Sequence, residues 1–426
     1  MKNINWLKNL NFFGVRPGLK RISLLLKKLS HPHRKLKVIH LAGTNGKGST
    51  ARIISKILEE HGFKVGLYTS PHLIKINERF LINDVPVSDE KLDFYLGRIK
   101  EALGGDKVTY FEVTTSLAFL YFAEEKVDFA VIECGMGGRL DATNVLWPEV
   151  SVITTIGFDH QKFLGNTLDK IAREKAGIMK RGVPCVIGEE KEETLHVFRT
   201  KAEKSKVPIF LFKKDFQIKL KNKKWYYFGK KVFKELDLSL QGFYQGKNLA
   251  CAIKTLEVLE DKGLFKIDEN ALKDALKKVK NPGRYEKFYI KNKEIILDAA
   301  HNPQGIEALV TSLKKDNFCK FILIMGITNP YGDKDFLTML EKFFHLASQV
   351  YICEFTSPRK IVTLEEWKKA LINLQKLKKI SFFQHPEEAY KKALSQSEQK
   401  ILITGSIYFI THWLKFFRNK EKNFLT

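Results

Sequence analysis

The chain has 426 residues and a formal net charge of +25, from 73 lysines and arginines against 48 aspartates and glutamates. Hydrophobic residues make up 44% and charged residues 28%, which is ordinary for a globular protein and excludes a disordered tail. The five cysteines lack the spacing of zinc or redox sites, and no apolar run suits a membrane span or a signal peptide, so we expect a cytoplasmic protein. The positive charge favours anionic partners without choosing among them.

The first half of the chain alternates short apolar runs with helical patterns. Residues 18–30 have helical spacing, and the run 36–42 leads into a glycine-rich turn and a helical pattern that ends near Gly62. Three more apolar runs, at 127–135, 150–157 and 182–188, are predicted strands. Short apolar strands separated by helices predict an α/β fold with a largely parallel sheet covered by helices.

Residues 209–239 follow a different pattern. Phe216, Ile218 and Leu220 alternate with polar residues before a possible turn at Asn222, which predicts an added β-hairpin with a solvated, cationic face. Such a face could also bind single-stranded nucleic acid, although the solvated hairpin is the simpler reading.

A second α/β alternation follows the helix-breaking residues 281–283. Helical patterns at 247–262 and 268–280 precede this break, and predicted strands lie near 294–300, 319–326, 349–355 and 400–406. We therefore expect two domains, residues 1–286 and a smaller α/β domain at 287–426 with four or more strands.

The clearest local motif is VIHLAGTNGKGST at residues 38–50, between a predicted strand and a predicted helix. Glycines let backbone amides approach phosphate oxygens, and a helix N-terminus adds a positive end. Lys47 would then contact the β- and γ-phosphates, and Ser49 would lie near a bound metal. The spacing departs from GxxxxGK[ST], because Gly48 separates Lys47 from Ser49. The motif predicts ATP binding by seven consecutive residues: Gly43, Thr44, Asn45, Gly46, Lys47, Gly48 and Ser49.

This variant, GTNGKGS, resembles the ATP loop of the Mur ligase superfamily, and in particular its folylpolyglutamate synthase and dihydrofolate synthase branch, including the bifunctional bacterial enzymes. Further motifs resemble that branch in the same order over nearly the whole chain: TSPHL at 69–73, YFEVTT at 110–115, ECGMGGRLDATNV at 133–145, GFDHQKFLGNT at 157–167, REKAGI at 173–178, QGFYQGKNLA at 241–250, PGR at 282–284, DAAHNP at 298–303, GDKD at 332–335, SPR at 357–359 and TGSIY at 404–408. The resemblance implies a Mur-ligase-like P-loop ATPase domain followed by a smaller Rossmann-like domain.

The resemblance also implies a magnesium site. Its metal ligands match Ser70, Glu133 and His160, and two Mg²⁺ ions are expected together with ATP as co-substrate. Glu133 is a reasonable hard-oxygen ligand, whereas spacing alone would make His160 an ordinary histidine. Lys175 matches a lysine that the family commonly holds as a carbamate, although by itself it reads as a helix lysine paired with Glu174 or Asp169. Lys47, His160 and Lys175 are the expected catalytic residues.

Substrate contacts are implied in the same way. Asn248, Arg284 and Asp298 match nucleotide contacts, and His301 and Ser406 match positions that help to bind glutamate. The pterin or folate site should involve Phe111, Glu112, Leu140, Asp141 and Ala142, because an aromatic face and a carboxylate suit a flat heterocycle with an amino-pyrimidine edge. Two departures concern the nucleotide side: Tyr244 stands where the family often has His, and Ala299 where Gly is common.

The expected activity is ATP-dependent ligation of L-glutamate to dihydropteroate, to folates or to both, through an acyl phosphate. We expect small-molecule substrates, a monomer, and neither nucleic-acid nor membrane partners. One alternative is a monofunctional folylpolyglutamate synthase. An alternative of another class is a P-loop protein that binds nucleic acid through its positive charge, and salt-sensitive retention on polynucleotide would distinguish it.

Overall fold

The computed structural model describes residues 2–10, 14, 16–372 and 379–424. Within it the chain forms two compact units. Unit 1 comprises residues 1–156, 164–239 and 246–280, and unit 2 comprises 157–163, 240–245 and 281–426. Among the described residues, no helix is long and apolar enough to cross a membrane.

Unit 1 is built on an eight-stranded sheet in which six neighbouring strands are parallel and two edge strands are antiparallel. In sheet order the strands are β4 (Val85–Pro86), β3 (Phe80–Ile82), β2 (Val65–Tyr68), β5 (Phe129–Glu133), β1 (Val38–Ala42), β6 (Val150–Ile153), β7 (Cys185–Ile187) and β8 (Ile209–Leu211). β1, β2, β5 and β6 are buried along their whole lengths, as expected for strands covered on both faces. Their carboxyl ends lie at one edge of the sheet, and the phosphate loop follows β1 there.

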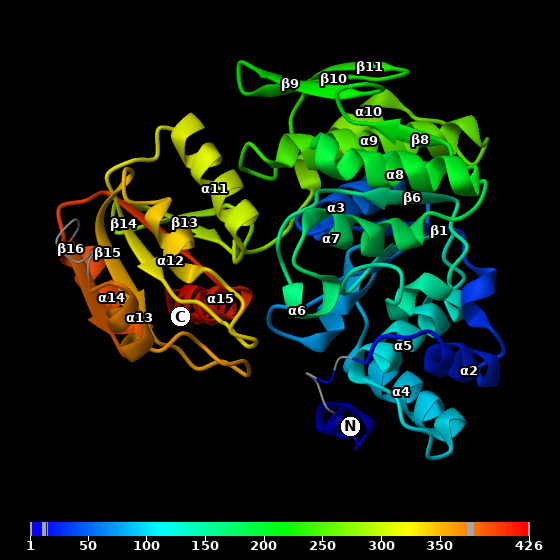
Figure 1. Cartoon of the computed structure of the whole chain (residues 1–426), viewed down its shortest axis with the longest axis horizontal. Helices are drawn as coiled ribbons and strands as arrows, with labels where there is room; N and C mark the ends of the chain where they lie inside the picture. Colours follow the sequence, from blue (N-terminus) through cyan, green and yellow to red (C-terminus); the bar gives the residue numbers. More distant parts are fainter. Residues whose placement is uncertain (1, 11–13, 15, 373–378, 425–426) are drawn as a thin grey trace. The chain divides into compact units, whose positions relative to one another are not determined.

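The helices of unit 1 pack on this sheet or, as the first two along the chain do, on other helices (Figure 1). They are α1 (Lys2–Asn9), α2 (Lys20–Lys28), α3 (Lys47–Glu60), α4 (Asp89–Leu103), α5 (Tyr110–Glu124), α7 (Leu168–Lys175), α8 (Glu192–Ser205), α9 (Gln245–Asp261) and α10 (Glu269–Lys278), with α6 (Gln161–Leu164) at a crossing between units. α3 ends where Gly62 adopts a φ of +87°, as its sequence predicts. α5 starts at a capping box, because Thr109 accepts from the backbone of Glu112 and Glu112 accepts from that of Thr109.

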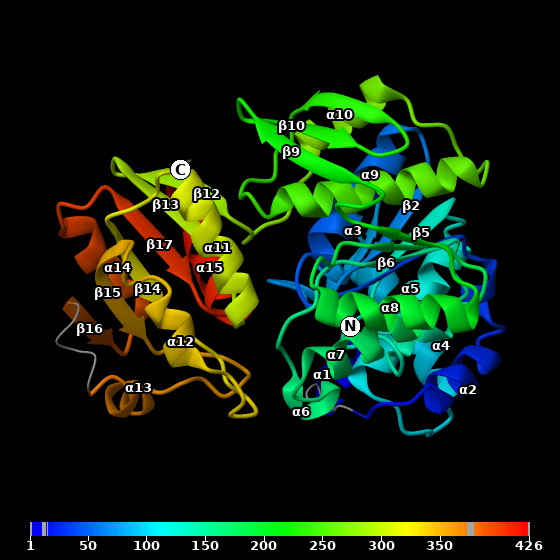
Figure 2. The same ribbon diagram turned by 45° about the horizontal axis from the view of Figure 1, so that its top comes forward.

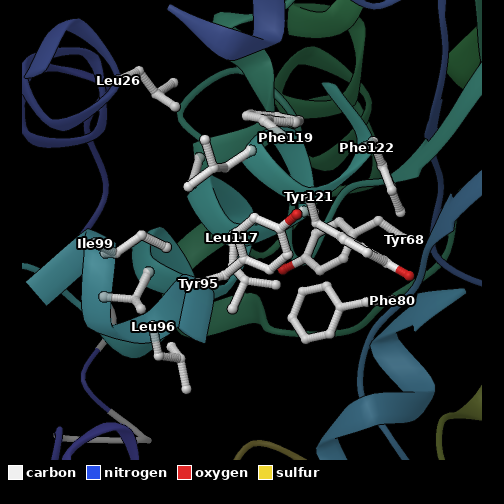
Figure 3. Packing of buried hydrophobic residues seen from close by; sticks show 14 of the residues in the cluster. Leu26, Tyr68, Phe80, Tyr95, Leu96, Ile99, Leu117, Phe119, Tyr121 and Phe122 are labelled. Carbon is white, nitrogen blue, oxygen red and sulfur yellow. The ribbon is translucent and has the colours of Figure 1, made fainter. Parts of the chain in front are cut away.

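A core of aromatic and aliphatic side chains joins α5 to the sheet and to α4 (Figure 3). α5 is buried around nearly its whole circumference, which suits a helix enclosed by other elements rather than an amphipathic surface helix. The rings of Tyr68 and Phe80 stack with centroids 5.6 Å apart, and those of Tyr95 and Tyr121 lie 5.5 Å apart. The Tyr68 hydroxyl lies 2.9 Å from Thr114 Oγ1, so its polar end is satisfied inside the core.

A separate antiparallel sheet lies beside α9 and α10 (Figures 1 and 2). Its order is β11 (Val232–Leu236), β10 (Lys224–Phe228) and β9 (Gln217–Lys221). Asn222 and Lys223 both have positive φ and form the turn between β9 and β10. The predicted hairpin is therefore present but gains a third strand, and the run from residue 209 contributes β8 to the main sheet instead.

Unit 2 is a second α/β unit, built on a six-stranded sheet. Its order is β12 (Glu286–Ile290), β13 (Lys293–Asp298), β17 (Lys400–Thr404), β14 (Phe321–Met325), β15 (Ala347–Cys353) and β16 (Lys379–Phe383), with β12 antiparallel at the edge. Its helices are α11 (Pro303–Lys315), α12 (Phe336–Glu341), α13 (Leu364–Ala370), α14 (Pro386–Ser395) and α15 (Ile407–Phe424). The expected α/β class and the second α/β sheet are thus confirmed. The predicted boundary between two functional domains, at residues 286 and 287, stays a prediction.

Candidate active site

The phosphate loop runs from the end of β1 to the first turn of α3. Gly43 and Gly46 have φ values of +151° and +89°, in the region that favours glycine. A Cβ on Gly43 would lie 1.9 Å from Thr154 Oγ1, so a side chain cannot be placed there without moving Thr154. Glycine is required because the loop passes too close to its neighbours for a side chain.

Two threonines that directly follow β6 form hydrogen bonds with the phosphate loop. Thr154 Oγ1 donates to the carbonyl of Asn45 at 2.7 Å, and the amide of Thr44 donates to the carbonyl of Thr155 at 2.7 Å. The hydroxyl of Thr155 also donates to Asn45 at 3.1 Å. Sequence reasoning missed these threonines, because their role depends on β1 and β6 being neighbours in the sheet, 110 residues apart along the chain.

Asn248, on the second turn of α9, packs directly against the loop. A Cβ built on Gly46 would lie 2.3 Å from Asn248 Oδ1. The predicted nucleotide contact Asn248 is therefore beside the phosphate loop although 202 residues separate it from Gly46.

Lys47, Glu133 and Ser70 meet above the first turn of α3. Lys47 Nζ donates to the carbonyls of Gly43 at 3.0 Å and Thr44 at 3.3 Å, and lies 3.9 Å from Glu133 Oε1. The backbone amide of Ser70 donates to Glu133 Oε2 at 3.2 Å. A buried carboxylate and a serine beside a lysine fit a hard divalent cation next to phosphate. Ser49, in the same turn of α3, is also buried.

Lys175 is buried at the end of α7, with 2% of the residue exposed. The glycine-rich loop after β5 packs tightly on this end of the helix: a Cβ on Gly138 would lie 2.8 Å from the carbonyl oxygen of Glu174 and 3.0 Å from that of Lys175. The amide of Arg139 donates to the carbonyl of Glu174 at 2.7 Å. The carboxylate of Glu174 forms an ion pair with Arg139 at 2.8 Å, and the expected pairing of Lys175 with Glu174 or Asp169 stays a prediction.

Phe111 lies at the start of α5 and faces the loop that follows Glu133. A Cβ on Gly135 would lie 2.5 Å from Phe111 Cζ, so the ring packs on bare backbone. Phe111 is only half-buried, unlike the residues that follow it in α5. Such a ring can offer an aromatic surface to a flat ligand.

The segment Leu140–Asp141–Ala142 follows the same loop. Asp141 caps the short 3-10 helix Ala142–Val145, accepting from the amide of Thr143 at 3.0 Å, and its other oxygen accepts from the amide of Met136 at 2.8 Å. Burial raises the pKa of the Asp141 carboxyl. Asp141 therefore fixes the shape of this loop from within.

Glu112 has partners that sequence reasoning did not foresee. Its carboxylate completes the α5 capping box and accepts from Arg21 Nε at 2.9 Å. The amide of Gly18 donates to the carbonyl of Leu140 at 3.4 Å, so the segment before α2 also contacts the predicted pterin site. No local pattern indicated Arg21, because its partner lies 91 residues further along the chain.

In unit 2, Asp298 ends β13 and is enclosed by hydrogen-bond donors. Tyr244 Oη donates to Asp298 Oδ2 at 2.7 Å, and the amides of Tyr285 and Ala300 donate at 2.9 and 2.8 Å. Burial and the adjacent carboxylate hold the pKa of Tyr244 well above its ordinary value, so it remains a donor. Arg284 Nη1 donates to the carbonyl of Ala299 at 3.4 Å. Both departures from the family pattern, Tyr244 and Ala299, thus adjoin predicted nucleotide contacts.

His301 and His160 lie on either side of Asp159, which the sequence analysis did not single out. His301 Nδ1 lies 2.8 Å from the carbonyl of Ala299, and its Nε2 lies 3.4 Å from Asp159 Oδ2. His160 Nε2 is 3.9 Å from Asp159 Oδ1. Burial opposes ionisation of Asp159, but the charge of His160, the hydrogen bond and charge of His301 and the charge of Lys334 together hold its pKa well below the ordinary value. Asp159, His160 and His301 all belong to unit 2, so the place of His160 in the metal site stays a prediction.

Ser406 is buried at the start of α15. Its hydroxyl lies 3.0 Å from Thr328 Oγ1 and accepts from the amide of Tyr408 at 3.3 Å. Ser406 and His301 follow neighbouring parallel strands, β17 and β13, and so lie at the same edge of the unit 2 sheet.

Family models match both parts of the chain. The Mur ligase middle domain matches residues 41–256, and the Mur ligase glutamate ligase domain matches residues 283–407. Together with the phosphate loop and its adjacent carboxylate, these matches define an ATP-dependent ligase of the Mur class.

Relatives cover nearly the whole chain. The dihydrofolate synthase/folylpolyglutamate synthase of Bacillus subtilis is 36% identical over 428 residues, covering 96% of each chain. The folylpolyglutamate synthase of Lacticaseibacillus casei is 35% identical, covering 91% of this chain and 92% of its own. The structure of E. coli FolC in complex with DHPP and ADP superposes with a TM-score of 0.89 at 27% identity, covering 98% of both chains. The chain belongs to the dihydrofolate synthase/folylpolyglutamate synthase family.

Proposed function

We propose that the chain joins L-glutamate both to dihydropteroate and to reduced folates, with ATP converting the substrate carboxylate into an acyl phosphate. The observation that carries this proposal is the convergence at one edge of the unit 1 sheet. Three features lie at this edge: the phosphate loop after β1, Ser70 after β2, and Glu133 at the end of β5. The segment expected to bind the pterin, residues 140–142, follows β5. A phosphoryl donor and a carboxylate acceptor can therefore bind side by side.

The residues of unit 1 bind and orient ATP. The amides of residues 43–46 and the N-terminus of α3 receive the phosphates, Lys47 neutralises the transferred group and Ser49 lies beside it. Asn248, on α9, packs against Gly46 of this loop. Ser70, Glu133 and His160 would hold magnesium, with two ions in all, which would neutralise charge on the phosphoryl group.

Lys175 is proposed to act as a carbamate. The ammonium group would first lose a proton, and addition of CO₂ to the neutral amine with loss of a second proton would give a carbamate, which replaces a cation by an anion at a buried position next to the glycine-rich loop. Mass analysis of the intact protein in bicarbonate, compared with Lys175→Arg, tests this directly. An unmodified lysine together with activity that does not depend on bicarbonate would contradict it.

The remaining substrate contacts divide between the two units. Phe111, Leu140 and Ala142 would receive the pterin, with Asp141 shaping the loop and Glu112 acting beside Arg21. Arg284 and Asp298 would contact the nucleotide, and His301 and Ser406 the incoming glutamate. ADP leaves when the substrate carboxylate takes the γ-phosphoryl group of ATP, and the glutamate amine then attacks the acyl phosphate, giving an amide and phosphate.

The decisive experiment measures ADP release with ATP, glutamate and either dihydropteroate or tetrahydrofolate. We expect release with both acceptors, dependence on glutamate, and a rate lowered about a hundredfold or more in Lys47→Met. The monofunctional alternative has a specific basis, because the L. casei relative is named only as a folylpolyglutamate synthase. Release with tetrahydrofolate alone would establish that alternative.

We further propose a cytoplasmic monomer without nucleic-acid partners. Sedimentation would test the oligomeric state. Salt-sensitive retention on polynucleotide without glutamate-dependent ADP release would instead support the nucleic-acid alternative.

A further inference from the structure

His40 is a buried histidine on the strand that leads into the phosphate loop. It lies in the middle of β1 with none of its surface exposed. Its Nε2 is 2.8 Å from Thr143 Oγ1 and 3.1 Å from Cys134 Sγ. These contacts connect β1 to the end of β5 and to the segment after it, over 103 residues of sequence.

The direction of these hydrogen bonds follows from the groups involved. Thr143 Oγ1 lies 2.6 Å from Asp141 Oδ1 and 3.3 Å from Cys134 Sγ, and the carboxylate is much the better acceptor. A hydroxyl has one hydrogen, so Thr143 donates to Asp141 and accepts from His40 Nε2. Burial, followed by the charge of Lys180, lowers the pKa of His40 to about 3, so the ring is neutral. Because Thr143 accepts from this ring, the hydrogen is on Nε2.

The same segment is tied down on a second side. Asn144 Nδ2 donates to the carbonyls of Arg139 at 2.9 Å and Gly177 at 3.1 Å. Lys180 Nζ donates to the carbonyl of Asn144 at 3.0 Å. The hydrogen bonds of Asn144 and Lys180 therefore fix residues 140–144 on one side. On the other side His40 holds these residues against β1 through Thr143.

We infer that His40 is a positioning residue for the pterin-binding segment. By donating to Thr143, which donates to Asp141, it holds residues 140–144 in the conformation that receives dihydropteroate or folate. The strand that ends in the phosphate loop thus also supports the segment proposed to receive the acceptor. This inference rests on the proposed function for its kinetic consequences but not for its structural ones.

Two pairs of variants test the donor chain. His40→Leu and Thr143→Val each remove one donor at similar volume, whereas His40→Gln and Thr143→Ser retain a donor. We expect His40→Leu and Thr143→Val to raise the KM for dihydropteroate at least tenfold and the KM for ATP by less than threefold. The conservative variants should recover most of this loss, and the double variant should be no worse than the poorer single variant.

Several outcomes would overturn the inference. Equal changes in both KM values, an unchanged KM for dihydropteroate with a lower Tm, or His40→Gln behaving like His40→Leu would each show that His40 only supports the fold.

Hydrogen exchange separates this inference from the proposed function. If the unaltered protein releases no ADP with any pteroate, the proposed function fails, yet the donor chain still predicts faster exchange of the Met136 and Thr143 amides in His40→Leu. Unchanged exchange at both amides would refute the donor chain in either case.

Discussion

The phosphate loop allows a sharp test because two glycines at opposite ends of α3 have nearly the same positive φ. Gly46 precedes the helix with a φ of +89°, and Gly62 follows it with a φ of +87°. A Cβ on Gly46 would lie 2.3 Å from Asn248 Oδ1, whereas a Cβ on Gly62 would have no neighbour within 4 Å. Replacing either glycine by alanine should therefore have a similar cost in backbone strain. Only the alanine at position 46 would crowd a neighbouring side chain.

The expected magnitudes follow from these contacts. An alanine held in the left-handed region costs about 1–2 kcal/mol, partly offset by lower entropy of the unfolded chain. Both variants should therefore lose about 1 kcal/mol in the free energy of unfolding. Gly46→Ala must also displace Asn248, because the clash is with the end of a side chain that can rotate. We expect this to raise the KM for ATP at least tenfold, or about 1.4 kcal/mol of binding free energy.

Urea unfolding and ADP release measured on both variants check this prediction. Gly62→Ala should keep the KM for ATP within twofold of the unaltered protein. Asn248→Ala should reproduce much of the Gly46→Ala defect, and combining the two should add little. If Gly46→Ala and Gly62→Ala bind ATP equally well, the loop does not cradle the nucleotide as argued.

Three further predictions concern single side chains. Lys47→Met should lower kcat/KM for ATP about a hundredfold or more at an unchanged Tm, and amide formation at full rate would contradict its role. Arg21→Gln should lower the free energy of unfolding in urea by about 2 kcal/mol, because Glu112 stays buried without its cation; an unchanged midpoint would refute this. His40 has its pKa lowered from 6.5 to about 3, so the unfolded chain binds more protons here and stability falls as pH falls below 6.5. By about pH 4.5 this costs roughly 2–3 kcal/mol, which His40→Gln should abolish in pH-dependent unfolding; an equally steep acid loss would contradict it.

The sequence predicted the local elements of this protein well. Apolar runs bounded by glycine became β1, β5, β6 and β7, and the alternation of strands with helices established the α/β class. The phosphate loop was recognisable because glycine spacing is a local property that backbone geometry requires. By contrast, β2 and β3 are short, with four and three residues, and the edge strand β12 is partly exposed along its length, so these strands depend on their neighbours in the sheet.

The sequence by itself determined the class of the chain, the phosphate loop and, through ordered motifs, the residues expected to bind substrates. Only the tertiary structure decided which distant residues meet: Thr154 under the loop, Asn248 on Gly46, Arg21 on Glu112 and His40 on Thr143. Such pairs are separated by about a hundred residues or more, so no sequence period links them. Thr154 reaches the loop because the neighbouring parallel strands β1 and β6 place their carboxyl ends at one edge, and the other pairs depend on how helices and loops pack around the folded sheet.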